Sequence, residues 1–309
     1  DGTRTNVSTT TGAVTLSTTT TSVPTVVSGW TGASTSPGTT LTLRKPSNVE
    51  VGDLLIIIVG NDDNTDTDQW DNATLKPTGF TLINEAGNTA TSDAHSAAFY
   101  RIADGTENAT TSVPAQVSAD YWGYYLRVTG ASTTNPINVT GADFNGAGSP
   151  HAVTGITTTA SNTLAFYILS GDGADTYPFS VSGTGWSESA ETFAGLTGTE
   201  SAGTWGTRSM VNPGATGAAT VAMTVSDSAS GFQFAINPST ARGTIMSPEI
   251  DFDSVSGQVD WGAVGFSATE PTGTDVKLRV YYTSTTSCDS IVPDTVLSGN
   301  SSGFDVSQM

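Results

Sequence analysis

The run Leu54-Leu-Ile-Ile-Ile-Val59 decides the fold class of this 309-residue chain. It is a continuous apolar segment of strand length, as expected for a strand that is buried on both faces. Similar segments follow at 97–102, 121–128, 164–169, 221–225 and 232–236, and clusters of Gly, Asn, Asp and Pro separate them. No segment has the periodicity of a three-turn helix. The sequence therefore predicts an all-β, jelly-roll-like β-sandwich.

The predicted sandwich contains an internal duplication. Residues 52–62 correspond to 161–172, because each segment is a buried strand that opens into an acidic loop. In the same way 78–87 correspond to 184–191, and 121–128 to 230–236. The offset of about 106 to 109 residues is longer than a solenoid repeat of about 20 to 50. We expect two related halves whose strands combine into one sandwich with one continuous core; two tandem domains are the alternative.

Two further segments flank the duplicated domain, which we expect to span residues 30–238. Residues 1–29 are rich in Thr and Ser and too polar to fold alone. Residues 239–309 contain three expected strands, at 243–251, 259–266 and 275–282, which form a second, smaller and incomplete β domain. An incomplete sheet offers unpaired backbone groups to a strand from another chain. Residues 1–29 are therefore expected either to pack along their own domain or to serve as a donor strand for a neighbouring copy.

Composition excludes several classes of protein. Lys and Arg total 10 against 29 Asp and Glu, a net charge of −19, which excludes a nucleic-acid binder that neutralises phosphates. No apolar run approaches the roughly 18 residues of a membrane-spanning helix, so we expect no membrane insertion. A single cysteine, Cys288, excludes an internal disulfide and a multi-cysteine zinc site. The first residue is Asp1 rather than Met, which favours export over a virion origin.

An acidic loop follows the deciding strand. Asp62, Asn64, Asp66 and Asp68 alternate along it, and Ca²⁺ takes six to eight oxygen ligands of this kind. The glycine and the distal glutamate of an EF-hand are absent, so the alternative is a solvated acidic loop. Asp172 and Asp175 form a poorer version in the second half. Calcium is the only cofactor that the sequence suggests.

Four tryptophans have polar neighbours in the sequence, which predicts exposed rings: Trp30, Trp70, Trp186 and Trp205. Trp70, beside the acidic loop, is a candidate for stacking on a sugar ring. The alternative is a role in the core, since Trp186 occupies the same repeat position as Phe80.

Catalysis has little support in the sequence. The two histidines, His95 and His151, have no nucleophile motif beside them, and the Gly-x-Ser-x-Gly elbow is absent. We therefore expect no enzymatic activity. Five Asn-x-Ser/Thr sequons are candidate glycosylation sites: Asn6, Asn72, Asn108, Asn138 and Asn300.

Short motifs in a fixed order resemble a known module. They are VGDLLIIIVGNDD at 51–63, PTGFTLI at 77–83, AFYRIADGTE at 98–107, YYLRVTGASTTNPI at 124–137, ITTTASNTLAFYILSGDGAD at 156–175 and GTGWSES at 183–189. Their order over about residues 24–238 resembles a β-sandwich module of bacterial extracellular proteins and of phage tail-fibre or appendage proteins. Residues 242–309 resemble the start of a different module of secreted surface proteins. The resemblance implies an exported or virion-surface structural role and no catalytic residues.

The sequence thus predicts a non-enzymatic extracellular structural protein, a subunit of a surface fibre or filament whose main partners are copies of itself. The first alternative is a structural protein of a phage virion surface or tail fibre. The second is an adhesin module that binds surface glycans.

Overall fold

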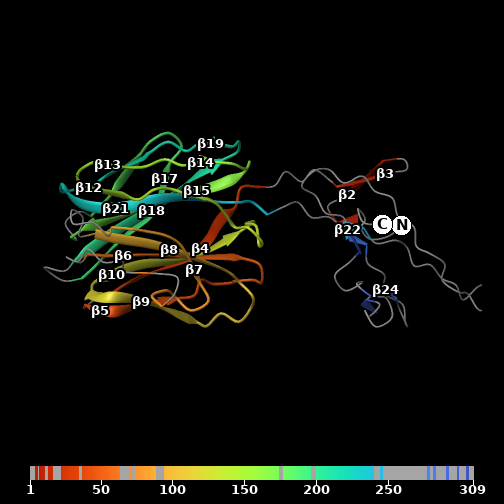
Figure 1. Ribbon diagram of the computed structural model, residues 1–309, viewed down its shortest axis with the longest axis horizontal. Helices are drawn as coiled ribbons and strands as arrows, with labels where there is room; N and C mark the ends of the chain where they lie inside the picture. The colour runs from red at the N-terminus through yellow and green to blue at the C-terminus, as the bar shows by residue number, and fades with distance from the viewer. Residues whose placement is uncertain are drawn as a thin grey trace, which may run out of the picture. The chain divides into compact units, whose positions relative to one another are not determined.

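The computed structural model is all-β (Figure 1). It describes residues 22–239 except 35–36, 63–69, 71–73, 88–93, 174–176 and 196–199. Outside that range it describes 4–5, 7–10, 13–16, 244–245, 277–278, 281–282, 290–291, 298 and 304–305. The chain divides into two compact units, Thr18–Arg242 and, together, Asp1–Ser17 with Gly243–Met309. Among the described residues no helix is long and apolar enough to cross a bilayer.

The first half of the larger unit is a two-layer antiparallel sandwich. Its strands are β4 (Thr25–Ala33), β5 (Gly38–Arg44), β6 (Leu54–Asp62), β7 (Thr81–Ala86), β8 (Ala94–Ile102), β9 (Thr110–Ala119) and β10 (Tyr121–Thr129). One layer is a five-stranded sheet in the order β4-β10-β6-β8-β7, and the other is the β5-β9 pair. The first strand thus pairs with the last, and the last with the third, an order that is jelly-roll-like.

The second half repeats this arrangement. Its strands are β11 (Ile137–Thr140), β12 (Phe144–Gly148), β13 (His151–Val153), β14 (Thr157–Thr158), β15 (Thr163–Asp172), β16 (Ser180–Ser182), β17 (Ser187–Ala194), β18 (Ser201–Met210), β19 (Gly214–Ala215), β20 (Ala219–Ala222) and β21 (Asp227–Ile236). One sheet has the order β11-β21-β15-β18-β17, with β12 also on β21. The other layer contains β13-β20-β16 and the β14-β19 pair.

The predicted duplication is confirmed by strand order and by register. Strands β6, β7, β8 and β10 of the first half correspond to β15, β17, β18 and β21 of the second. A β-bulge interrupts β7 between Leu82 and Asn84, and a bulge interrupts β17 between Glu188 and Ala190, at the same repeat position. A bulge at the same repeat position supports the duplication more specifically than strand order alone, because a bulge shifts every later pairing by one residue.

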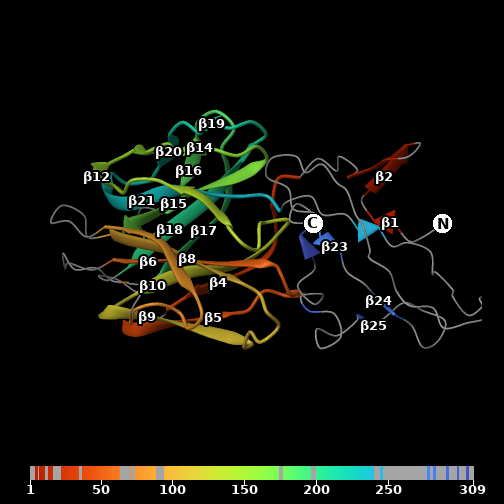
Figure 2. The same ribbon diagram turned by 45° about the vertical axis from the view of Figure 1, so that its right-hand side comes forward.

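The two halves pack face to face, so that four layers alternate with three hydrophobic cores (Figures 1 and 2). The central core lies between the five-stranded and six-stranded sheets and takes side chains from both halves. Each half also has a core of its own beneath its outer layer. The expectation of one continuous core is therefore wrong, whereas the predicted burial of 54–59 and 164–169 is confirmed.

Strand pleating explains the three cores. On β6, Leu54, Ile56 and Ile58 point into the central core. Leu55, Ile57 and Val59 point into the core of the first half. Successive side chains of a strand face opposite sides of a sheet, so a strand between two cores must be apolar at every position.

Two glycines make the central core possible. The Trp122 ring lies between the two sheets, and a Cβ added to either Gly60 or Gly203 would overlap it. Its indole N–H donates a hydrogen bond to Ser170 Oγ across the core at 3.1 Å. The bond satisfies the one polar group of a side chain that is otherwise completely buried.

The smaller unit combines both ends of the chain. Its strands are β1 (Arg4–Thr5), β2 (Val7–Thr10), β3 (Ala13–Leu16), β22 (Thr244–Ile245), β23 (Lys277–Leu278), β24 (Tyr281–Tyr282), β25 (Ser290–Ile291) and β26 (Phe304–Asp305). They form the antiparallel pairs β1-β22, β2-β3, β23-β26 and β24-β25. In the first pair Arg4 lies opposite Ile245, and Thr5 lies opposite Thr244.

These pairings change the expected boundaries. The larger unit begins at Thr18 rather than residue 30, and β4 forms its edge strand from Thr25 onward. In the described part of the N-terminal segment before Thr18, β1 pairs with β22 of the C-terminal segment, and β2 and β3 pair with each other. The expected strand at 259–266 lies outside the described residues.

Candidate functional sites

The acidic loop begins where β6 ends. Asp62 is the last residue of the strand and is half-buried, whereas Asn64, Asp66 and Asp68 lie outside the described residues. Asp172 ends β15 in the same way, and Asp175 is again outside. No group of three or more His, Cys, Asp or Glu among the described residues is placed to hold a metal ion. Calcium binding by the loop stays a prediction.

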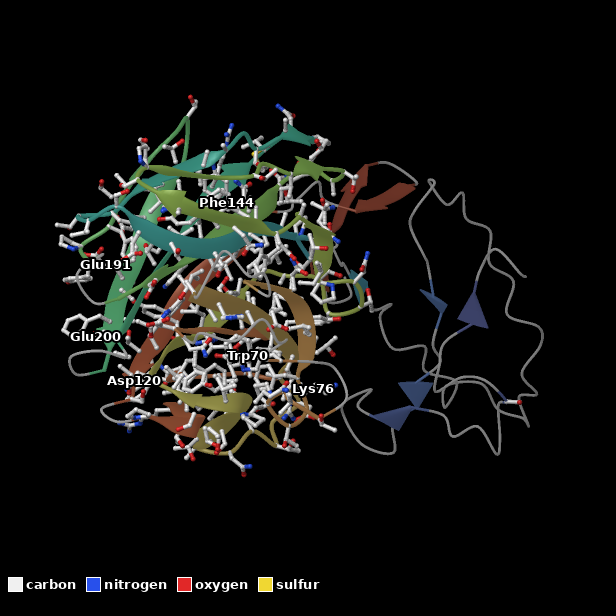
Figure 3. The ribbon with its side chains drawn as sticks, turned by 60° about the vertical axis from the view of Figure 1, so that its left-hand side comes forward. Trp70, Lys76, Asp120, Phe144, Glu191 and Glu200 are labelled. Carbon is white, nitrogen blue, oxygen red and sulfur yellow. The ribbon has the colours of Figure 1, made fainter. Side chains whose placement is uncertain are left out.

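Trp70 closes the core of the first half and is not available to a sugar (Figure 3). Its side chain is 1% exposed and meets the Tyr121 ring edge-on, with centroids 6.2 Å apart. Its backbone N–H donates to the Glu85 carboxylate at 3.2 Å. The expectation of glycan stacking on Trp70 is therefore wrong, because stacking needs a free ring face.

The second half confirms that this is a structural position. There Phe179 enters the core, and its backbone N–H donates to Glu191 Oε2 at 2.6 Å. Glu85 and Glu191 occupy the same position after the two bulges. In both halves a glutamate of the edge strand thus anchors the aromatic residue that plugs the core.

Polar neighbours in the sequence were a poor guide to exposure for the other tryptophans as well. Trp186 and Trp205 are 7% and 5% exposed, and only Trp30, at 38%, presents a substantial part of its ring to solvent. Trp186 meets the Tyr167 ring edge-on at 5.6 Å, and Trp205 stacks on Phe166 at 5.9 Å.

The structure describes two of the five candidate glycosylation sites, and their surroundings differ. Asn108 is exposed. Asn138 is half-buried, and its Nδ2 donates to Thr159 Oγ1 at 3.0 Å and to Asn237 Oδ1 at 2.8 Å, so a glycan there would cost these hydrogen bonds. Asn6, Asn72 and Asn300 lie outside the described residues, as does Cys288.

Both histidines are buried. His95 on β8 is 0% exposed and His151 on β13 is 2% exposed, with its ring edge-on to Phe144 at 5.4 Å. Burial lowers the pKa of His151, so its imidazole is uncharged at neutral pH. Neither side chain is placed to act on a substrate from solution in this conformation.

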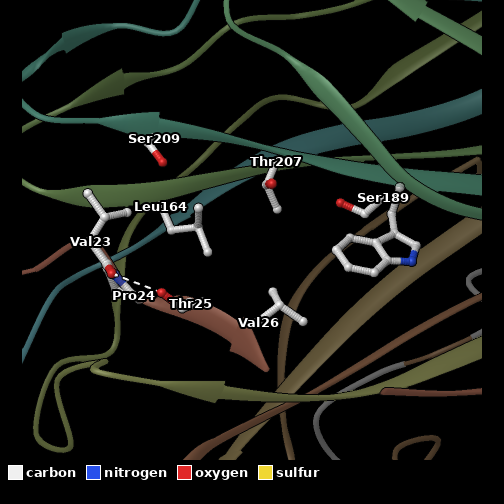
Figure 4. Close-up of a pocket in the computed structure, with 9 residues that line it drawn as sticks. Val23, Pro24, Thr25, Val26, Leu164, Ser189, Thr207 and Ser209 are labelled. Carbon is white, nitrogen blue, oxygen red and sulfur yellow. Dashed lines mark hydrogen bonds between the residues drawn. The ribbon is translucent and has the colours of Figure 1, made fainter. Parts of the chain in front are cut away.

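A cavity of about 470 Å³ opens at one side of the central core, between the start of β4 and strands β17 and β18 (Figure 4). Val23 and Leu164 give it apolar walls, Trp205 adds an indole, and Ser189, Thr207 and Ser209 add hydroxyls. None of its nine lining residues is titratable, so it offers no acid, base or nucleophile activated by one.

This cavity arises from a difference between the halves. The register places Ile83, Tyr100 and Ile102 of the first half at the positions of Ser189, Thr207 and Ser209. The first three side chains are large and pack against the central core. Small hydroxyl residues at the same three positions leave the space unfilled.

Comparison with protein-family models, with curated proteins and with solved structures finds no match to this chain. The resemblance of residues 24–238 to a module of extracellular and phage proteins therefore stays a prediction.

Proposed function

We propose that this chain is a non-enzymatic structural protein, a subunit of an extracellular fibre or filament. The observation that carries the proposal is the pairing of β1 with β22, which joins the two ends of the sequence in one small unit. The same strand pair can form between the N-terminal segment of one copy and the C-terminal segment of the next.

Such an exchange would produce an open polymer. Identical elements swapped between copies make the same contacts as within one chain, so the exchange costs little. A contact between the head of one copy and the tail of the next is heterologous, and it makes a filament when its rotation does not close. The larger unit, with its doubly buried sheets, would be carried along as the rigid body of each subunit.

Cross-linking tests whether β1 pairs within a chain or between chains. Arg4 and Ile245 are directly opposed, so the double variant Arg4→Cys/Ile245→Cys, made in a Cys288→Ser background, should form a disulfide under mild oxidation. We expect a ladder of disulfide-linked multimers on a non-reducing gel and filaments by electron microscopy.

Two controls make the result specific. The single variant Arg4→Cys in the same background can give dimers but no ladder. Deletion of residues 1–10 should abolish filaments and leave the larger unit folded. If the double variant yields only internally closed monomers at every protein concentration, and no filaments form, the proposal is wrong.

A further inference from the structure

Strand β4 forms one edge of the five-stranded sheet and lies open to solvent. It pairs with β10 on one side only. Six of its nine residues are exposed, and among them Val27 is 48% and Trp30 is 38% exposed. Strand β5 of the outer layer and β17 of the second half pack against β4 and β10 alike. They cover the faces of this part of the sheet and leave the β4 edge uncovered.

The register with β10 shows which backbone groups of β4 face outward. Ser34 follows β4, and its N–H donates to Tyr121 O at 2.8 Å, in continuation of the register. Because antiparallel pairs alternate in their hydrogen bonding, Gly29, Thr31 and Ala33 turn their N–H and C=O groups away from β10. All three residues are exposed, and no described residue hydrogen-bonds to these groups. They form a row of unpaired donors and acceptors, which is a template for another strand.

This edge lacks the features that normally protect a sheet edge. Natural proteins blunt edges with charged residues, prolines or short strands. In the described part of the larger unit, every other edge strand longer than five residues has a charge or a proline: Arg44 in β5, Glu85 in β7, Pro114 in β9, and Glu188 and Glu191 in β17. Strand β4 has neither. A β-bulge at Val27 leaves Ser28–Ala33 as its regular segment.

We infer that β4 pairs antiparallel with β4 of a second copy of this chain, so that two five-stranded sheets become one continuous sheet. Each copy has a net charge of −19, so an interface between copies needs a contact surface without carboxylates. The β4 edge provides one, whereas β7 and β17 would bring glutamates together. Pairing β4 with itself also covers the unprotected edge of both copies at once.

A two-fold axis through Thr31 gives the register of the pair. Thr31 then lies opposite Thr31 of the second copy, and Gly29 lies opposite Ala33, so all the outward-facing groups are used. The bulky Trp30 lies opposite Gly32, which has no side chain to oppose it, and threonine pairs are favourable across strands. An axis through Trp30 would oppose the two indoles and leave Ala33 without its partner.

This contact differs from the β1–β22 exchange and does not depend on it. Self-pairing of β4 about a two-fold axis is isologous and closes at two copies, whereas the strand exchange is heterologous and stays open. Where both form, the β4 contact joins two filaments side by side.

Disulfide trapping on the full-length chain tests the register. Thr31→Cys in a Cys288→Ser background places one thiol at the axis, where opposed residues lie about 5.5 Å apart, within the range of a disulfide. Under mild oxidation we expect a band of twice the monomer mass on a non-reducing denaturing gel. The detergent dissolves non-covalent assemblies, so the band reports the β4 contact whether or not the β1–β22 exchange occurs.

Val27→Cys in the same background is the matched control, because Val27 is exposed on the same strand. The axis separates the two copies of this position by eight residues along the strand, about 26 Å, so it should cross-link at least about 10-fold more slowly. Adding Ala33→Lys to the Thr31→Cys variant puts a charge on the edge and should abolish the dimer band. Adding Thr110→Lys, on exposed Thr110 of β9, should leave the band unchanged.

Circular dichroism first establishes that each variant folds like the parent. The inference is overturned if folded Thr31→Cys gives no dimer band, if Val27→Cys cross-links as fast, or if Ala33→Lys leaves the band intact. It is also overturned if Thr31→Cys cross-links only when mixed with a Val14→Cys variant, since the strand on the β4 edge would then be β3 of another copy.

Discussion

Glu188 places a carboxylate at a position where the first half has an apolar side chain. Its counterpart just before the bulge of β7 is Leu82, which packs against the core of the first half. Glu188 is half-buried, and its Oε1 accepts a hydrogen bond from Thr204 Oγ1 at 2.9 Å. Burial raises the pKa of Glu188, and the nearby charge of Glu191 adds to the effect. The folded protein therefore holds the Glu188 proton more tightly than the unfolded chain does.

The sign of the pH dependence follows from that shift. An acid whose pKa is raised by folding adds stability below its unfolded pKa, about 4.5 here, and loses that contribution as pH rises through the folded value. Glu188→Gln keeps an acceptor for Thr204 but cannot ionise. The variant should melt at the same temperature as the parent at pH 4 and up to about 2 °C higher at pH 7, a small gain because water screens a half-buried carboxylate. Calorimetry at both pH values measures it, and an equal difference at both would contradict the assignment.

At the scale of single residues the sequence was informative about repeats and misleading about exposure. Polar flanking residues wrongly placed the Trp70 ring at the surface, because burial depends on what the fold brings over a side chain. The repeat comparison was the better signal, since Trp186 aligns with the core residue Phe80. The cavity of about 470 Å³ gave no sequence signal, because it depends on which side chains the β-bulge and the strand register turn toward the central core.

Among the elements, edge strands β7 and β17 have a β-bulge at the same position, but the extra residue differs between them. The extra residue is Ile83 in β7 and Ser189 in β17. Ile83 packs against the central core, whereas Ser189 lines the cavity of about 470 Å³. The bulge turns this residue toward the central core in both halves, so the side chain alone decides whether that side of the core is closed.

Exchanging the two side chains should move stability in opposite directions. Ser189→Ile adds apolar surface to an existing cavity and should stabilise the larger unit by up to about 1 kcal/mol. Ile83→Ser removes packed methyl and methylene groups and should destabilise it by about 2 kcal/mol. Urea denaturation of the two variants gives both values. A neutral Ile83→Ser would show that this side of the central core does not contribute to folding.

The sequence predicted the central strands but not their grouping into cores. A run that is apolar at every position, as in β6 and β15, indicates a strand covered on both faces. It does not indicate which element supplies each cover, because that depends on how two sheets approach each other. Two halves that share a single core would show the same sequence pattern as two halves that each have a core and stack to form a third.

For the larger unit as a whole, the central core is the interface between the two halves, and each half covers an apolar sheet face of the other. It contains Leu54, Ile56, Ile58 and Trp122 from the first half and Leu164, Phe166, Ile168 and Phe232 from the second. Two backbone hydrogen bonds join the segment between the halves to the end of the second half. Ser132 N–H donates to Asn237 O at 3.0 Å, and Ser239 N–H donates to Gly130 O at 2.7 Å. The halves should therefore unfold together, although each has a core of its own.

Separating the halves tests this cooperativity directly. A fragment of residues 18–132 would expose the apolar face of its five-stranded sheet, and a fragment of 133–242 would expose the matching face of the six-stranded sheet. Soluble monomers rarely expose contiguous apolar patches of more than a few hundred Å². Each fragment alone should form oligomers or aggregates by sedimentation velocity and bind a hydrophobic dye. Coexpression should restore a 1:1 complex with the circular dichroism of the intact unit. If each fragment is instead a monomer with a sharp melting transition, the outer cores suffice for folding, and the central core is only a docking surface between two independent domains.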